Sequence, residues 1–155
     1  MPVYNNLLKK LFSYLSNHSY LALAAILFLG LLLRGYNLTT RALWLDEADA
    51  ANLLKNNFFN LWQPIFISGN NPGYIYLLKV WSQFFGDTEA ALRSLSLVLG
   101  LASIFLIYKF GRLLFNRTIG LMAGFLLAIN YFSIFYSIQA RQYSLVVFLS
   151  LSSYY

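Results

Sequence analysis

The sequence has no cysteine at all and little charge of either sign. Without cysteine the chain can form neither a disulfide nor a thiolate metal site. Charged residues make up 10% of the 155 residues and hydrophobic residues 59%, whereas a soluble domain is roughly one quarter charged. The surplus of apolar side chains has to face something other than water, and lipid is the environment that we expect.

Acidic residues are scarcer than basic ones, five against eleven, which gives a formal net charge of +6. A basic balance can indicate binding to nucleic acid. Here the basic residues are scattered singly, with no run longer than Lys9-Lys10. Orientation in a membrane explains this distribution better than a nucleic-acid partner does.

Long apolar runs are abundant. Three of them are long enough to cross a bilayer core, which takes about 20 residues, and a fourth is still apolar at the last residue, as in a helix cut short. The predicted spans are residues 20–38, 92–111, 118–140 and 142–155. The sequence therefore predicts an all-α fold, a polytopic membrane helical bundle.

The segment between the first two spans, residues 39–91, is mixed, and its apolar stretch 73–86 is several residues too short to cross. This stretch predicts an amphipathic helix lying in the membrane interface. Its apolar face holds Tyr74, Leu77, Leu78, Trp81, Phe84 and Phe85, and its polar face holds Lys79, Ser82 and Gln83.

The charges then predict which side is which. With 73–86 lying flat, the N-terminal tail and the loop 109–117 share one side, which carries five basic residues and no acidic residue. That side should be the cytoplasm. The loop 39–91 and the stretch QARQY at 139–143 should then meet at the outer face.

Three of the five acidic residues, Asp46, Glu47 and Asp49, lie within the four positions 46–49, a few residues after the first span. Carboxylates there can simply begin a helix, where they complement its dipole, or they can form a catalytic group. Arg93 and Arg141 are predicted at the same face. Each is either a membrane anchor or a ligand for an anion.

Four segments follow one another as they do in one known family: LWLDEA (43–48), NPGYIYLLKVW (71–81), FGDTEAALRSLSLVLG (85–100) and YSIQARQYSL (136–145). The chain resembles the N-terminal part of polyprenol-phosphate-sugar-dependent membrane glycosyltransferases of the GT-C fold, such as the dolichyl-phosphate-mannose–protein mannosyltransferases. The resemblance implies that residues 1–155 are the N-terminal part of one transmembrane catalytic domain. It also implies a cell-membrane protein with a cytoplasmic N-terminus and an extracytoplasmic active site.

Such an enzyme moves a sugar from a polyprenyl-phosphate carrier to the hydroxyl of a protein, lipid or glycan acceptor. The hydroxyl needs a base, and the leaving phosphate needs an arginine, a lysine or a divalent metal. The resemblance implies Asp46 as the catalytic carboxylate and Glu47 as a metal ligand or orienting group, so that the two acids would hold any Mg²⁺ or Mn²⁺. The residues expected to bind the donor are Arg93, Arg141, Lys79, Gln139 and Tyr143.

Two other classes of protein stay open on the sequence. The chain could be a non-enzymatic multi-pass membrane subunit, or part of a transporter whose outer acids bind a cation. A transporter would need ionisable residues at mid-membrane, whereas the acids of this chain lie in loops.

Overall fold

The computed structural model describes residues 19–36, 38–39 and 42–154, and every regular element in these ranges is a helix. The predicted all-α class is confirmed for this part of the chain. The predicted basic tail with Lys9 and Lys10 lies outside the described residues.

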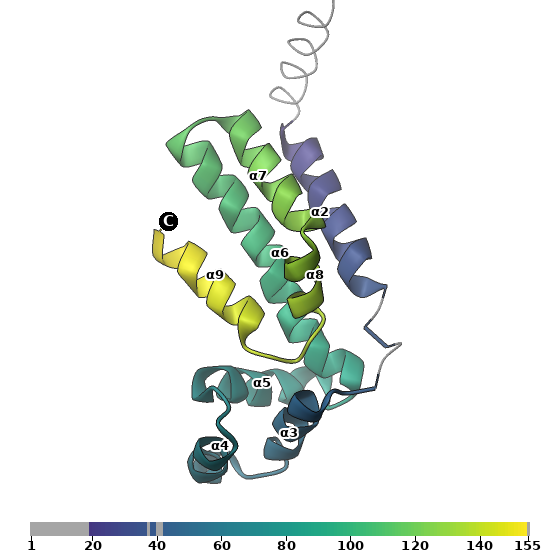
Figure 1. Ribbon diagram of the computed structural model, residues 1–155, viewed down its shortest axis with the longest axis vertical. Coiled ribbons are helices and arrows are strands. Elements are labelled where there is room, and N and C mark those ends of the chain that lie inside the picture. The colour runs from purple at the N-terminus through teal and green to yellow at the C-terminus, as the bar shows by residue number, and fades with distance from the viewer. Residues whose placement is uncertain (1–18, 37, 40–41, 155) are drawn as a thin grey trace, which may run out of the picture.

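Three helices run side by side along the long axis of the molecule (Figure 1): α2 (Ser19–Gly35), α6 (Glu89–Leu114) and α7 (Arg117–Ile129). With 26 residues, α6 is about 39 Å long. Among the described residues it is the one unbroken helix both long and apolar enough to cross a membrane. Helices α2 and α9 (Tyr143–Tyr154) are apolar but shorter.

Glycines let α6 and α7 approach closely. A Cβ on Gly120 would lie 2.5 Å from the carbonyl oxygen of Tyr108, and one on Gly111 would lie 2.9 Å from the Cα of Gly120. The hairpin of α6 and α7 therefore depends on backbone-to-backbone contact that any larger residue would push apart.

The single helix expected over residues 118–140 is two helices, α7 and α8 (Tyr131–Ser137), bent by 61°. Asn130 starts the second helix, because its side-chain oxygen accepts the N–H of Ser133 at 2.9 Å. The break leaves the last carbonyls of α7 without helical partners. The buried Arg34 of α2 donates to two of them, those of Leu127 at 3.3 Å and Ala128 at 3.0 Å.

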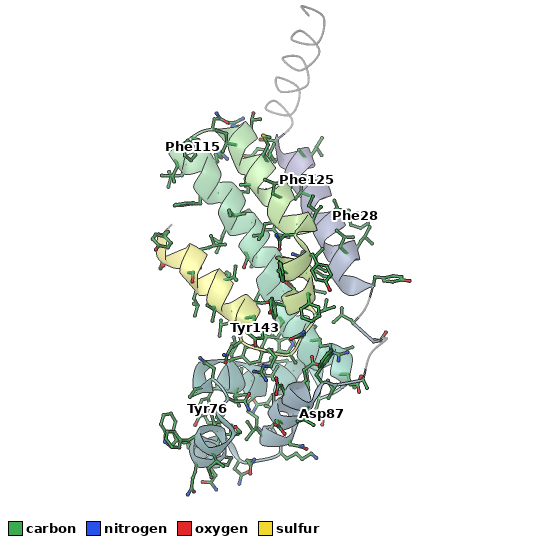
Figure 2. The ribbon with its side chains drawn as sticks, in the orientation of Figure 1. Phe28, Tyr76, Asp87, Phe115, Phe125 and Tyr143 are labelled. Atoms are coloured by element: carbon green, nitrogen blue, oxygen red, sulfur yellow. The ribbon has the colours of Figure 1, made fainter. Side chains whose placement is uncertain are left out.

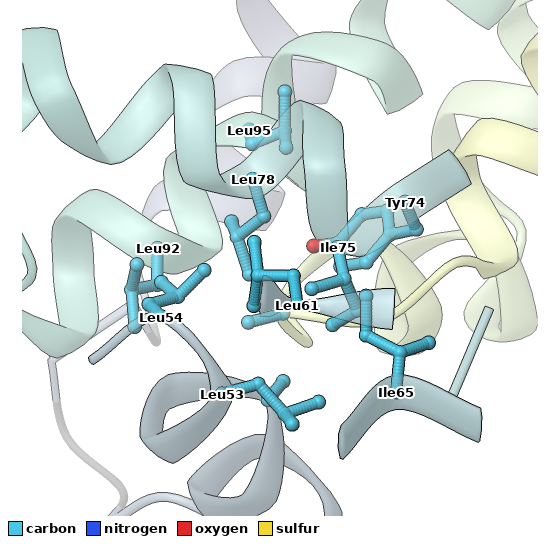
Figure 3. Packing of buried hydrophobic residues seen from close by; sticks show 11 residues of the cluster. Leu53, Leu54, Leu61, Ile65, Tyr74, Ile75, Leu78, Leu92 and Leu95 are labelled. Carbon is cyan, nitrogen blue, oxygen red and sulfur yellow. The ribbon is translucent and has the colours of Figure 1, made fainter. Parts of the chain in front are cut away.

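The remaining helices gather at one end of the bundle: α3 (Leu45–Leu53), the 3₁₀ turn η1 (Phe58–Asn60), α4 (Trp62–Ser68) and α5 (Pro72–Phe85). We call residues 45–85 the α3–α5 lobe. In Figure 1, α5 lies crosswise to α6. The lobe has its own apolar core, continuous with the first turns of α6 (Figure 3), which includes Leu53, Leu61, Ile65, Ile75, Leu78, Leu92 and Leu95.

Helix α5 matches the amphipathic helix predicted over 73–86, and Asn71 caps it by accepting the N–H of Tyr74 at 3.2 Å. Its apolar residues divide into two groups. Tyr74 and Leu78 are buried in the lobe, together with Ile75, which the prediction left off the apolar face. Exposed apolar side chains remain on α5, namely Leu77, Val80, Phe84 and Phe85. One side of α5 therefore serves the core of the lobe, and another presents apolar surface outward.

Candidate functional site

Glu47 and Arg93 form a buried, two-pronged ion pair between α3 and α6. The Nε of Arg93 donates to Oε1 of Glu47 at 3.0 Å, and Nη2 donates to Oε2 at 2.8 Å. The side chains are 1% and 3% exposed, respectively. Paired hydrogen bonds of this kind are among the strongest polar contacts that a protein makes. They fasten the first turn of α3 to the second turn of α6.

Two backbone groups complete the surroundings of the same carboxylate. The N–H of Trp44 donates to Oε2 at 3.1 Å, as when a third helical residue caps its own helix. The N–H of Ala140 donates to Oε1 at 2.7 Å and brings in the loop between α8 and α9, residues 138–142. Glu47 therefore accepts four hydrogen bonds from three separate segments.

These contacts determine the charge of Glu47. Burial by itself raises the pKa of Glu47, but the hydrogen bonds from Arg93, Ala140 and Trp44, together with the charge of Arg93, hold the pKa below its ordinary value. Glu47 is thus an ionised structural acceptor at neutral pH and is unsuited to carrying a proton.

The terminal nitrogens of Arg93 also donate to backbone carbonyls of the protein. Its Nη1 donates to the carbonyl of Leu38 at 2.9 Å and its Nη2 to that of Ala42 at 3.1 Å. The phosphate-binding role expected for Arg93 does not fit this geometry, and neither does the alternative of a lipid-facing anchor. The reason is burial: the guanidinium closes a junction inside the protein.

Asp46 and Arg141 form a second, open pair next to the first. The Nη1 of Arg141 lies 2.8 Å from Oδ2 of Asp46. The side chain of Arg141 is 21% exposed and that of Asp46 is 65% exposed. The guanidinium carbon also lies 5.8 Å from the ring centroid of Tyr143, near the range of a cation–π contact. Figure 2 shows Tyr143 where α9 begins, beside the α3–α5 lobe.

The structure thus brings together four of the residues singled out in the sequence: Asp46, Glu47, Arg93 and Arg141. Tyr143 joins them through Arg141. Gln139 is near, since its carbonyl accepts the N–H of Arg141 at 2.8 Å, but its side chain forms no hydrogen bond with the described Asp46.

Lys79 is placed elsewhere. Its ammonium group donates to the carbonyl of Leu54, at the end of α3. It lines a separate hollow of mixed polar and apolar residues, which also include Asn52, Lys55 and Asp87. The described contacts of Lys79 do not connect it with Asp46 or Arg141, so the predicted reach to a donor phosphate gains no support here.

The two acids do not fit a divalent cation in this arrangement. All the acceptor positions of Glu47 face N–H donors, and Asp46 already faces a guanidinium. Across the described part of the chain, no three histidine, aspartate or glutamate side chains are grouped so as to hold a metal ion.

Sequence reasoning missed two hydroxyl groups at this site. The Oγ of Ser96 donates to the carbonyl of Arg141 at 3.2 Å, and the Oη of Tyr74 lies 2.9 Å from the same Oγ. A signal was present in the sequence, because Ser96 lies three residues after Arg93 in α6 and so shares its face of the helix.

An apolar hollow of about 240 Å³ opens beside Tyr143, between α6, α8 and α9. Tyr136 lines it as well, and the ring centroids of Tyr136 and Tyr143 lie 4.5 Å apart. The hollow is lined by the Tyr143 ring that the guanidinium of Arg141 approaches, and neither Arg141 nor Asp46 is among its lining residues.

Comparison with known proteins gives a match to a protein family. A family model described as dolichyl-phosphate-mannose-protein mannosyltransferase matches residues 69–155, more than half of the chain, and this region includes Arg93 and Arg141. No curated protein and no solved structure matches the chain. The resemblance drawn from the sequence is confirmed, and the chain belongs to the dolichyl-phosphate-mannose-protein mannosyltransferase family of membrane glycosyltransferases.

Proposed function

We propose that the protein transfers a sugar from a polyprenyl-phosphate carrier to an acceptor hydroxyl at the extracytoplasmic face of the membrane. The observation that carries this proposal is the open pair of Asp46 and Arg141. It combines an exposed carboxylate with a partly exposed guanidinium at one end of a helical bundle, in a chain of a glycosyltransferase family.

Asp46 is the base in this scheme. Its carboxylate takes the proton of the acceptor hydroxyl while the acceptor oxygen forms a bond to the anomeric carbon of the sugar. The bond between that carbon and the phosphate oxygen breaks, and its electron pair leaves with the polyprenyl phosphate. Because Asp46 is exposed, the proton then passes to water.

Arg141 is the ligand for the leaving phosphate. Among the described residues, its guanidinium forms one ion pair, from Nη1 to the carboxylate of Asp46. Nε and Nη2 are left to donate to two phosphate oxygens, which suits the fork of an arginine better than the point charge of a lysine. One guanidinium can therefore stabilise the leaving group and keep the base beside it.

Glu47 and Arg93 act as positioning residues. Asp46 precedes Glu47 in the first turn of α3, and the four bonds of Glu47 hold that turn against α6 and the 138–142 loop. This support favours the orienting role for Glu47 over the metal-binding role. No step of the scheme passes through a metal.

The multi-pass arrangement, the N-terminal part of a GT-C-type domain, belongs to the same proposal. Along the chain, α2 runs toward the lobe, α6 away from it, the bent pair α7 and α8 back toward it, and α9 away again (Figure 1). The crosswise α5, with exposed apolar side chains, suits the membrane interface.

The replacement Asp46→Asn tests the base. It keeps the shape of the side chain and removes the proton acceptor, so transfer should fall by about 10²–10⁴-fold. The rate is measured with the protein in nanodiscs, a polyprenyl-phosphate-linked mannose and an acceptor peptide. Asp49→Asn, an exposed acid in the same helix, should keep the wild-type rate. Wild-type turnover in Asp46→Asn would remove the assignment.

A further inference from the structure

We infer that Tyr74 and Ser96 form a hydroxyl relay that positions Arg141 for the donor phosphate. This inference rests on the proposed function, because it concerns how the phosphate ligand of that site is held. It adds two positioning residues and gives the crosswise helix α5 a part in donor binding.

The direction of the relay follows from its last acceptor. A carbonyl oxygen can only accept, so Ser96 Oγ must donate its one hydrogen to the carbonyl of Arg141. Tyr74 must then donate to Ser96 Oγ, at 2.9 Å. Both residues are buried, with Tyr74 2% and Ser96 0% exposed, so water cannot replace either partner.

The relay is one of two anchors on the backbone around Arg141. The N–H of Ala140 is held by Glu47 at 2.7 Å, and the carbonyl of Arg141 is held by Ser96 at 3.2 Å. These anchors lie on either side of the Cα of Arg141. Together they determine where its side chain leaves the loop to contact Asp46 and the ring of Tyr143.

Helix α5 supplies the outer end of the relay and is itself fastened to α6. Trp81, two turns after Tyr74, donates its Nε1 to the carbonyl of Ala91 and to Oγ of Ser94, both at 3.1 Å. Two aromatic residues on one side of α5 thus hold it across the first turns of α6. Because α5 is held to α6, the position of Tyr74 is fixed relative to Ser96 and so to the backbone of Arg141.

A purely structural role for the hydroxyl pair makes a different prediction. In that case removing a hydroxyl alters donor affinity only as far as it loosens the fold. The test separates stability from affinity with Ser96→Ala, Tyr74→Phe and the double replacement. The matched controls are Tyr76→Phe on α5, whose ring packs against Phe58, and Ser82→Ala, whose hydroxyl bonds only to its own helix.

The measurements are the dissociation constant for farnesyl phosphate and the thermal unfolding midpoint, both with the protein in nanodiscs. Ser96→Ala should weaken binding about fivefold and lower the midpoint, because it leaves the Tyr74 hydroxyl buried without an acceptor. The double replacement should recover part of the midpoint, since the Tyr74 hydroxyl is then no longer left buried without an acceptor, and only the carbonyl of Arg141 has lost its partner. Its binding should stay as weak as that of Ser96→Ala, and the KM for the donor should rise with little change in kcat.

Recovery of farnesyl phosphate binding along with the midpoint in the double replacement would overturn the relay. So would wild-type binding in Ser96→Ala. In both cases wild-type binding and transfer would still stand, and the proposed function with them. If the wild-type protein neither binds farnesyl phosphate nor transfers a sugar, the proposed function fails and the relay fails with it.

Discussion

Asp46 and Glu47 are neighbours in the sequence, yet their carboxylates have opposite surroundings. Glu47 accepts four hydrogen bonds in a site with 1% exposure, whereas Asp46 is mostly open to solvent and meets one arginine. The same division separates Arg93 from Arg141. Burial therefore favours a structural role for Glu47 and Arg93, and exposure is consistent with the catalytic role that we propose for Asp46 and Arg141.

Replacing each arginine by alanine should separate these roles. Arg93→Ala leaves Glu47 as a buried, unpaired charge, so the free energy of unfolding should fall by about 3–5 kcal/mol. Arg141→Ala breaks a pair open to solvent and should cost at most about 1 kcal/mol. Its farnesyl phosphate binding should nevertheless weaken by about one to two powers of ten, because charge-assisted bonds are lost.

The measurements are denaturant unfolding in detergent and binding of farnesyl phosphate. Arg141→Lys serves as the conservative variant and should restore only part of the affinity, because an ammonium cannot form the two-pronged contact. An Arg93→Ala protein that is as stable as wild type, or an Arg141→Ala protein that binds normally, would contradict the division of roles.

At the scale of the helices, two side chains hold elements that the backbone alone would not. Glu47 holds α3 to α6 and the 138–142 loop, and Arg34 holds the break between α7 and α8. The guanidinium of Arg34 is buried in contact with carbonyls of Gly30, Leu127 and Ala128 and with Oγ of Ser133. This role accounts for an ionisable residue inside an apolar helix without a transport function.

The attachment of α3 should depend on pH. The pKa of Glu47 is lowered in the folded protein from an ordinary value of 4.5. Its contribution to stability is therefore fully present above about pH 4.5 and is lost as the pH falls through the lowered pKa. We expect the unfolding midpoint to decrease with acidification below pH 4.5 in the wild type.

Glu47→Gln should be less stable than wild type at neutral pH and should lose less stability on acidification. Glu89→Gln, an exposed acid at the start of α6, should keep the wild-type dependence. The check is a series of unfolding midpoints between pH 7 and the acid limit of the protein. Parallel curves for Glu47→Gln and wild type would contradict the assignment.

At the scale of the whole molecule, the two ends of the bundle differ. The lobe end carries the acids and the proposed site. The other end, where α6 turns into α7, carries Lys109, Arg112 and Arg117 (Phe115 marks this end in Figure 2). The lobe end also carries Lys55, Lys79, Arg93 and Arg141, whereas the α6–α7 end has basic residues and, among the described residues, no acid. From the bias of cytoplasmic loops toward lysine and arginine we predict that the α6–α7 end lies in the cytoplasm.

Single cysteines should report this orientation, because the chain has none of its own. Cysteines placed at Ser68 and Thr88 should react with a membrane-impermeant thiol reagent from outside intact cells, and one at Asn116 should react only after permeabilisation. A cysteine at Thr40 should behave like the first two. Outside labelling of Asn116 but not of Thr88 would mean that α5 crosses the membrane.

The sequence by itself determined the helical class, the amphipathic character of α5, the family and the neighbourhood of Asp46, Arg93 and Arg141. These follow from composition, periodicity and the order of short motifs, all of which are local. Only the tertiary structure decided that Arg93 is bound to Glu47 and that all four acceptor positions of Glu47 are occupied. It also decided that α7 ends at Ile129 and that Tyr74 is linked to Arg141 through Ser96. The two arginines, Glu47 and the path through Ser96 depend on contacts between residues far apart in the chain, and the end of α7 combines the local cap of Asn130 with the distant Arg34. Burial and hydrogen-bond partners, which no local pattern specifies, set the charge, reach and freedom of a side chain.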